Sequence, residues 1–267
     1  MNIKIVACDM DYTLLTNEGK LPPGFDDYIK RLYEAGVEFA VASGRPGYTL
    51  QELFPTYRDR FYFISDNGAC IRHGEKIIYT SLMEDGVIQE MSKMVLETKT
   101  GIPIICGLNG GYYPEEGTRY DSFFGRFFSR RNPVKDILSV HAEANKFTVF
   151  CPDGDAKEIM EEYYIPRYAK DYSVTLGGDV WIDIMNPNIN KGSAMVQLER
   201  YCGIGKENIM AFGDHLNDLE MLRYVPNSYA MENAIPEVKA VAAYIAPSNE
   251  EYGVLKVLEE TVLASIE

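Results

Sequence analysis

The stretch "IKIVACDMDYTLL" (Ile3–Leu15) decides how this sequence is interpreted, because an apolar run ends there on two carboxylates. Ile3 to Cys8 is rich in β-branched residues and is typical of a short buried strand. Asp9 and Asp11 follow it directly. In open parallel sheets the ligand crevice lies beyond the carboxyl ends of the strands, so this pair is a candidate for a functional site.

The segment after this strand alternates between helical and strand patterns. A helical pattern runs from about Phe25 to Ala35 and ends at Gly36, and "VEFAVAS" (Val37–Ser43) is a second buried strand. "FYFIS" (Phe61–Ser65) adds a third. Strand, helix and strand within about 40 residues predict a parallel sheet with right-handed crossovers.

The alternation stops at Asp66 and returns after "NPNINKG" (residues 186–192). "DNGACIRHGEKIIYT" (residues 66–80) carries two turn signals and predicts a hairpin. Beyond it we expect an α+β unit, with helices at about 84–99, 119–128 and 155–164 and strands at 102–106, 146–151, 172–176 and 180–185.

The last part of the chain again favours an α/β structure. It contains a helical pattern from Ser193, the strand "NIMAFG", a helix from about Leu216, the strand "NSYAM" and a final helix from about Glu251. We therefore predict an α/β fold, a doubly wound Rossmann-like core formed by residues 1–82 and 187–267. An α+β domain is expected as an insertion at 83–186.

Composition limits the classes of function. The chain has 267 residues, of which 46% are hydrophobic and 25% charged, as in ordinary globular proteins. With 26 basic and 40 acidic residues, the net charge of −14 disfavours nucleic acid and anionic membranes as partners. Five dispersed cysteines without a CxxC pair, and no apolar stretch long enough for a signal peptide or a spanning helix, lead us to expect a cytoplasmic protein. The oligomeric state is not indicated.

Three polar clusters fall at the ends of predicted parallel strands and should converge on one crevice. These are Asp9 with Asp11, Ser43-Gly44-Arg45, and Gly213-Asp214. Together with Asp218, the aspartates would bring too much negative charge together unless a cation lies among them. Mg²⁺ is the expected ion, because it prefers oxygen ligands and often binds through carboxylates and a substrate phosphate.

A magnesium site of this kind implies a substrate that carries phosphate. The sequence offers matching donors in Ser43, the backbone N–H groups around Gly44, and Lys191. Each of these residues alone has an ordinary alternative, since aspartates and "SGR" are common in turns and a lysine before a helix is usually solvated. Their order along the chain favours a site.

The motifs "DMDYT", "SGR", the lysine of "NKG", and "GDHLND" occur in that order, and they resemble the haloacid dehalogenase-like hydrolases. Within that family the chain is most similar to the Cof-type phosphatases with a large α/β cap. The predicted insertion lies between the second and third motifs, where that group carries its cap, and "DNGA" (Asp66–Ala69) also resembles it. The resemblance spans almost the whole chain.

The resemblance implies a role for each matching residue. Asp9 would be the nucleophile that forms an aspartyl-phosphate, Asp11 the general acid and base, and Lys191 a cation for both Asp9 and the phosphate. Mg²⁺ would be held by Asp9, the main-chain carbonyl of Asp11, and Asp214, with Asp218 near or behind it. Loop or substrate contacts are expected from a second set of residues: Thr13, Ser43, Gly44, Asn67, Lys191 and Asn217.

The sequence thus predicts a magnesium-dependent phosphatase that acts on a small phosphorylated metabolite such as a sugar phosphate. Two alternatives remain open at this stage. A sugar phosphomutase of the same superfamily shares the nucleophile and a similarly placed cap. A protein that binds a phosphorylated metabolite without turning it over would use the same scaffold, although it would not need both Asp9 and Asp11.

Overall fold

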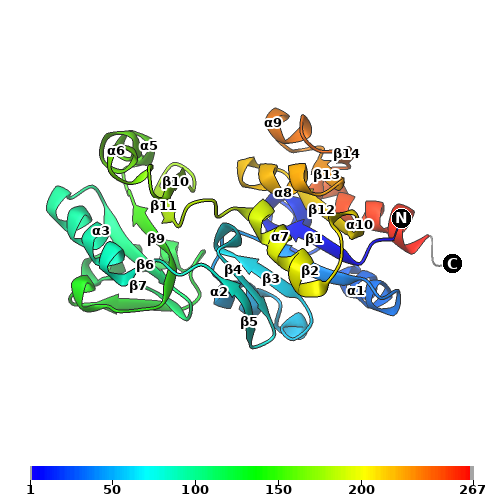
Figure 1. Ribbon diagram of the computed structural model, residues 1–267, viewed down its shortest axis with the longest axis horizontal. Helices are drawn as coiled ribbons and strands as arrows, with labels where there is room; N and C mark the ends of the chain where they lie inside the picture. The colour runs from blue at the N-terminus through cyan, green and yellow to red at the C-terminus, as the bar shows by residue number, and fades with distance from the viewer. Residues whose placement is uncertain (1, 265–267) are drawn as a thin grey trace. The chain divides into compact units, whose positions relative to one another are not determined.

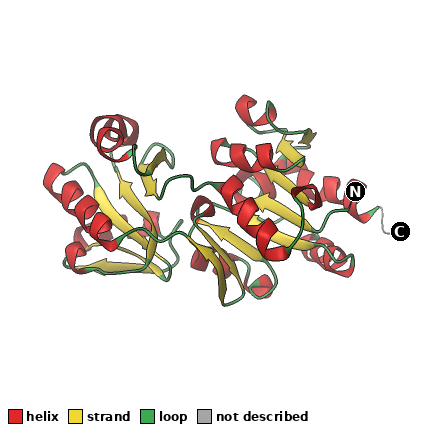
Figure 2. Ribbon diagram, in the orientation of Figure 1, coloured by secondary structure: helices red, strands yellow, loops and turns green. Residues whose placement is uncertain are grey.

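The computed structural model describes residues 2–264, and Figure 1 and Figure 2 show its helices and strands. The chain divides into two compact units. The first comprises the residues up to Gly44, Phe54–Tyr79, and the residues from Asn190 onward. The second comprises Arg45–Leu53 and Thr80–Ile189. No helix within residues 2–264 combines the length and the apolar character that crossing a lipid bilayer requires.

An eight-stranded sheet forms the centre of the first unit. The strand order is β14 (Tyr244–Ala246), β13 (Asn227–Met231), β12 (Ile209–Gly213), β1 (Ile5–Asp9), β2 (Glu38–Ala42), β3 (Tyr62–Ser65), β4 (Cys70–His73) and β5 (Lys76–Thr80). The strands from β14 to β3 are parallel, and β4 runs antiparallel to β3. Every residue of β1 is buried, as expected for a central strand that is covered on both faces.

Helices cover the two faces of this sheet (Figure 1): α1 (Phe25–Glu34), α7 (Lys191–Cys202), α8 (Leu219–Tyr224), α9 (Pro236–Lys239) and α10 (Gly253–Leu258), which continues into a π-helical turn at Glu259–Leu263. In α1, Phe25, Ile29 and Leu32 are buried at helical spacing, and Gly36 follows at φ +70°. The doubly wound fold predicted from the alternation of strands and helices is confirmed.

A six-stranded sheet forms the second unit. Its order is β10 (Ser173–Leu176), β11 (Trp181–Met185), β9 (Ala144–Phe150), β6 (Ile102–Gly107), β7 (Gly110–Pro114) and β8 (Arg131–Val134). One apolar core packs β6, β9 and β11 against α3 (Asp85–Thr98) and a helical run formed by α5 (Ala156–Ile159), a π turn and α6 (Ile165–Tyr168). Phe147 and Ile182 are completely buried in this core.

An aromatic cluster forms a second core in the same unit. The sequence predicted one helix over residues 119–128, and this was wrong: a 3-10 segment (Glu115–Tyr120) leads into the single turn of α4 (Asp121–Phe124), which ends at Gly125. The four nearby phenylalanines still converge on Trp181, with ring centroids 5.5–6.2 Å from its ring. Contacts with the Trp181 indole hold this segment in place, so the four phenylalanines pack together without a continuous helix.

The short helix α2 (Gly47–Leu53) was not predicted, and it packs within the second unit. The Thr49 hydroxyl donates to the Phe127 carbonyl at 3.2 Å, and Arg130 pairs with Glu52 at 2.8 Å. Strands β7, β8 and β14 and helix α9 were also missed. The glycines of β7 (GGYYP) and the proline of β8 (RNPV) obscure a strand pattern, and β14 and α9 have only 3 and 4 residues.

Candidate active site

Asp9 is the last residue of β1, the strand between β12 and β2. In the parallel register Asp9 lies opposite Ala42, so Ser43 follows one residue beyond it on the neighbouring strand. A tight π-type turn (Met10–Leu14) carries the chain away from Asp9. Asp9 is only 7% exposed, and a buried carboxylate needs a compensating charge.

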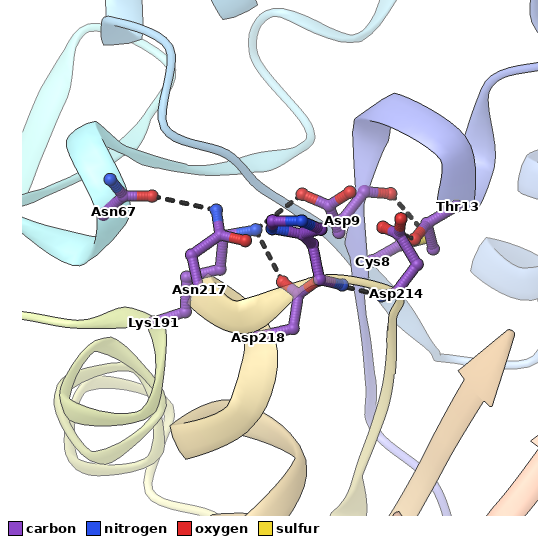
Figure 3. A network of polar contacts seen from close by, with 9 residues as sticks. Cys8, Asp9, Thr13, Asn67, Lys191, Asp214, Asn217 and Asp218 are labelled. Carbon is purple, nitrogen blue, oxygen red and sulfur yellow. Dashed lines mark hydrogen bonds and ion pairs between the residues drawn. The ribbon is translucent and has the colours of Figure 1, made fainter. Parts of the chain in front are cut away.

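Lys191 supplies that charge, as Figure 3 shows. Its Nζ lies 2.5 Å from Oδ1 of Asp9 and 2.6 Å from Oδ1 of Asp218, and the side chain has no exposed surface. Lys191 is the first residue of α7. Asn190 caps that helix, because its side-chain oxygen accepts the Ser193 N–H at 2.8 Å. The cap therefore fixes the position from which the lysine reaches both carboxylates.

The loop after β12 carries the other two acids. Oδ2 of Asp218 accepts the backbone N–H groups of Asp214 and His215 at 2.9 and 3.1 Å, which folds the loop over Gly213. A Cβ on Gly213 would lie 2.5 Å from that of Asp218, so only glycine fits there. Thr13 donates to Oδ1 of Asp214 at 2.8 Å, so the turn after β1 is joined directly to this loop.

The carboxylates of Asp9, Asp214 and Asp218 offer oxygens that all lie within 4.8 Å of one another. Both oxygens of the Asp218 carboxylate already accept hydrogen bonds, one from Lys191 and the other from two backbone N–H groups. Among residues 2–264, by contrast, no hydrogen bond is donated to Oδ2 of Asp9 or Oδ2 of Asp214. These two oxygens are the donor type that Mg²⁺ prefers, so the residues present fit this ion. Asp218 is better suited to orient Lys191 and the loop.

Burial perturbs the ionisation of the whole cluster. It raises the pKa of Asp9 well above its ordinary value, with Lys191 acting in the opposite direction. Burial, and then the charge of Asp218, raise the pKa of Asp214 to about 6. For Lys191, burial alone would lower the pKa, but the carboxylates of Asp218 and Asp9 outweigh it and raise the pKa. The lysine therefore stays charged, and a bound cation would stabilise the ionised aspartates.

Asp11 lies in the turn beyond Asp9, and its side chain is partly exposed and outside the three-carboxylate cluster. Ser43 is 3% exposed, and its carbonyl accepts the Asn67 N–H at 3.0 Å. Asn67 in turn accepts a hydrogen bond from the Asn217 amide at 3.1 Å (Figure 3). A Cβ on Gly44 would approach the Asn67 side chain. The structure thus connects Ser43, Gly44, Asn67 and Asn217.

Sequence reasoning missed two residues that shape this region. Asn190 caps α7, and the pattern "NKGS" carries that signal as an asparagine three residues before a serine. Asn233 donates to the carbonyl of Tyr12 at 2.8 Å and so holds the turn that carries Asp11. No local pattern identifies Asn233, because its partner lies 221 positions away in the sequence.

The site is thus a buried aspartate at the end of a central parallel strand, linked through a lysine to a second acidic loop in an α/β fold. Residues 6–258 match the haloacid dehalogenase-like hydrolase family, and the chain belongs to that family. The resemblance identified from the motifs is confirmed.

Named relatives indicate the type of reaction. 5-Amino-6-(5-phospho-D-ribitylamino)uracil phosphatase YbjI of Escherichia coli is 28% identical to this chain, covering 98% of it and 97% of the relative. A protein of the same activity name from Bacillus subtilis, YcsE, is 27% identical over 98% of this chain and 97% of its own. The solved structure of SMU.1108c from Streptococcus mutans superimposes with a TM-score of 0.85, at 30% identity over 97% of this chain and 98% of that one. The protein is therefore a phosphatase of this family that acts on a phosphorylated small molecule.

Proposed function

We propose that this protein is a magnesium-dependent phosphomonoester hydrolase that works through an aspartyl-phosphate on Asp9. The observation that carries the proposal is the buried group formed by Lys191, Asp9 and Asp218 beside Asp214. A carboxylate that is buried, held by a fixed cation and close to a second acid is set up to react rather than to stabilise the fold.

In the first step, a carboxylate oxygen of Asp9 attacks phosphorus while the bond from phosphorus to the substrate oxygen breaks. Asp11, as the carboxylic acid, gives its proton to the departing oxygen. Its position outside the buried cluster leaves it accessible to a leaving group. Lys191 keeps the Asp9 carboxylate in one orientation and offsets charge on the phosphoryl group.

In the second step, a water molecule attacks the phosphorus of the aspartyl-phosphate. The Asp11 carboxylate takes a proton from that water, the bond between phosphorus and the Asp9 oxygen breaks, and inorganic phosphate leaves. Asp9, Asp214 and the Asp11 carbonyl would hold Mg²⁺. When bound, the ion would neutralise the charge that develops on the transferring phosphoryl oxygens. Ser43 and the backbone N–H of Gly44 would donate to the same oxygens.

The proposed substrate is a small phosphorylated metabolite, a sugar phosphate or a related sugar-alcohol phosphate. Three relatives are named as phosphatases of a phospho-ribitylamino-uracil, which carries its phosphate on a sugar alcohol. The second unit is proposed to act as the cap that selects among such substrates. A cap of this kind closes over the core and excludes bulk water during the reaction.

The test is release of inorganic phosphate, with Mg²⁺, from 5-amino-6-(5-phospho-D-ribitylamino)uracil, a panel of sugar phosphates and p-nitrophenyl phosphate. Asp9→Asn should fold normally and lose essentially all turnover, because an amide is not a nucleophile at phosphorus. Asp27→Asn, the same change at an exposed position on α1, is the matched control and should keep full activity.

A mutant Asp9→Asn that keeps a tenth of the wild-type rate would contradict the assignment of the nucleophile. Conversion of a sugar phosphate to its isomer without phosphate release would show that the acceptor is a sugar hydroxyl rather than water, as in a mutase.

A further inference from the structure

The turn between β3 and β4 has a backbone conformation that requires support from its surroundings. Asp66, Asn67 and Gly68 have φ angles of +49°, +53° and +101° in succession. Residues other than glycine rarely adopt positive φ, and asparagine and aspartate are the most tolerant exceptions. A simple hairpin turn needs no such run, so the contacts of this turn call for an explanation.

The backbone of the turn contacts the segments that carry two of the site motifs. The Asn67 N–H donates to the carbonyl of Ser43 at 3.0 Å. Gly68 lies against the residue before Lys191, since a Cβ there would come within 2.3 Å of the Asn190 carbonyl oxygen. The turn is therefore fixed between the end of β2 and the beginning of α7.

The Asn67 side chain adds contacts to two further groups of the site (Figure 3). Its Oδ1 accepts a hydrogen bond from the Asn217 Nδ2 at 3.1 Å. A Cβ on Gly44 would lie 3.1 Å from the same oxygen and 3.4 Å from Nδ2 of Asn67. The amide thus fills the space beside Gly44 and holds Asn217 at the same time. None of these contacts reaches Asp9 or Asp11.

We propose that Asn67 is a positioning residue for the phosphate-binding groups, an inference that rests on the proposed function. Its side chain fixes the turn at Ser43-Gly44 relative to Asn217, so that donors from separate segments face the phosphoryl group together. Its left-handed backbone is what brings the amide to this place. Asn67 itself does not act on the substrate. Small displacements of such donors lower both phosphate binding and turnover.

The experiment compares Asn67→Gly, Asn217→Ala and the double variant with the wild type. Glycine adopts the positive φ without strain, so the variant removes the side chain without adding backbone strain. Asn67→Gly should lower kcat/KM by about tenfold or more. The kcat/KM of the double variant should lie within about twofold of that of Asn217→Ala alone, because the two amides act as one unit.

Asn227→Ala is the matched control. Asn227 donates to the carbonyls of Glu207 and Ile209 at the amino end of β13, the end opposite the site. This variant should lower Tm and leave kcat/KM unchanged. Equal losses of kcat/KM in Asn227→Ala and Asn67→Gly would show that the assay follows folded stability, and would overturn the proposal. Wild-type kcat/KM in Asn67→Gly would overturn it as well.

Calorimetric titration with inorganic phosphate in the presence of Mg²⁺ provides a reading that does not depend on turnover. Asn67→Gly should weaken phosphate binding about tenfold, whereas Asn227→Ala should bind as the wild type does. Unchanged phosphate binding in Asn67→Gly would overturn the positioning role. Absence of turnover in the wild type, with the binding difference intact, would contradict the proposed hydrolase and leave the positioning role supported.

Discussion

Lys191 has no exposed surface, and its ammonium group lies between two buried carboxylates. The arrangement depends on the lysine, because without its charge the two buried carboxylates would repel each other and remain uncompensated. Asp218 is additionally held by two backbone N–H groups. Lys191 is therefore expected to matter both for folding and for the orientation of Asp9.

Replacement of Lys191 by methionine tests this expectation. The change keeps the length of the side chain but leaves Asp9 and Asp218 facing each other without a cation, so we expect a loss of about 3–5 kcal/mol in the free energy of unfolding. Urea denaturation measures it, and phosphate release should fall to background.

Lys30→Met is the control, because Lys30 is 75% exposed and pairs only at 3.9 Å with Glu34. It should change the free energy of unfolding by less than about 0.5 kcal/mol. A Lys191→Met protein as stable as the Lys30→Met protein would refute the structural role assigned to Lys191.

At the scale of elements, the site depends on the close approach of α7 and α8. Gly192, the second residue of α7, makes it possible: a Cβ there would lie 2.6 Å from the backbone carbon and oxygen of Glu220 in α8. Lys191 and Asp218 lie at the beginnings of these two helices. The spacing of the helices thus controls the ion pair between them.

Gly192→Ala should therefore force α7 and α8 apart, with a loss of about 1–3 kcal/mol and lower activity. Gly86→Ala in α3 is the matched change, since no atom lies within 4 Å of a Cβ at that position. It should raise stability by up to about 1 kcal/mol, because alanine favours a helix. Thermal unfolding of both variants decides the matter, and a stabilised Gly192→Ala protein would contradict this account.

At the scale of the whole molecule, a net charge of −14 and a cluster of buried carboxylates make the protein sensitive to cations and to pH. Burial raises the pKa of Asp214 to about 6, above the ordinary value of 3.8. Protonation of this group thus stabilises the metal-free fold as the pH falls through 6. Bound at this site as proposed, Mg²⁺ would stabilise the ionised form of Asp214 above that pH and would compete with the proton below it.

We therefore expect Mg²⁺ to raise Tm more at pH 7.5 than at pH 5.5, as thermal unfolding with and without the ion will measure. Chelation by EDTA should abolish phosphate release, and added Mg²⁺ should restore it. Asp214→Asn should remove most of the Mg²⁺-dependent increase in Tm. Full activity in EDTA, or an equal Mg²⁺-dependent increase in Tm at both pH values, would refute the metal site.

The sequence by itself determined the family and the class of fold. The alternation of apolar runs with helical patterns fixed the parallel core, and the motifs placed Asp9, Ser43 and Asp214 at strand ends. These features are local, so the periodicity of hydrophobic residues and the composition of short segments are enough to predict them. The bent aromatic segment around Trp181 and the short helix α2 were missed, because contacts within the second unit, rather than propensity, decide their form.

Only the tertiary structure decided which of these groups meet. Lys191 pairs with Asp9 across 182 positions, and Thr13 reaches Asp214 across 201. The left-handed turn at Asp66–Gly68 and its contacts to Ser43, Asn190 and Asn217 likewise follow from strand order. Such contacts depend on which strands become neighbours in the sheet, and no local pattern encodes that. Local sequence therefore defines the reactive groups, while long-range packing sets their distances and their ionisation.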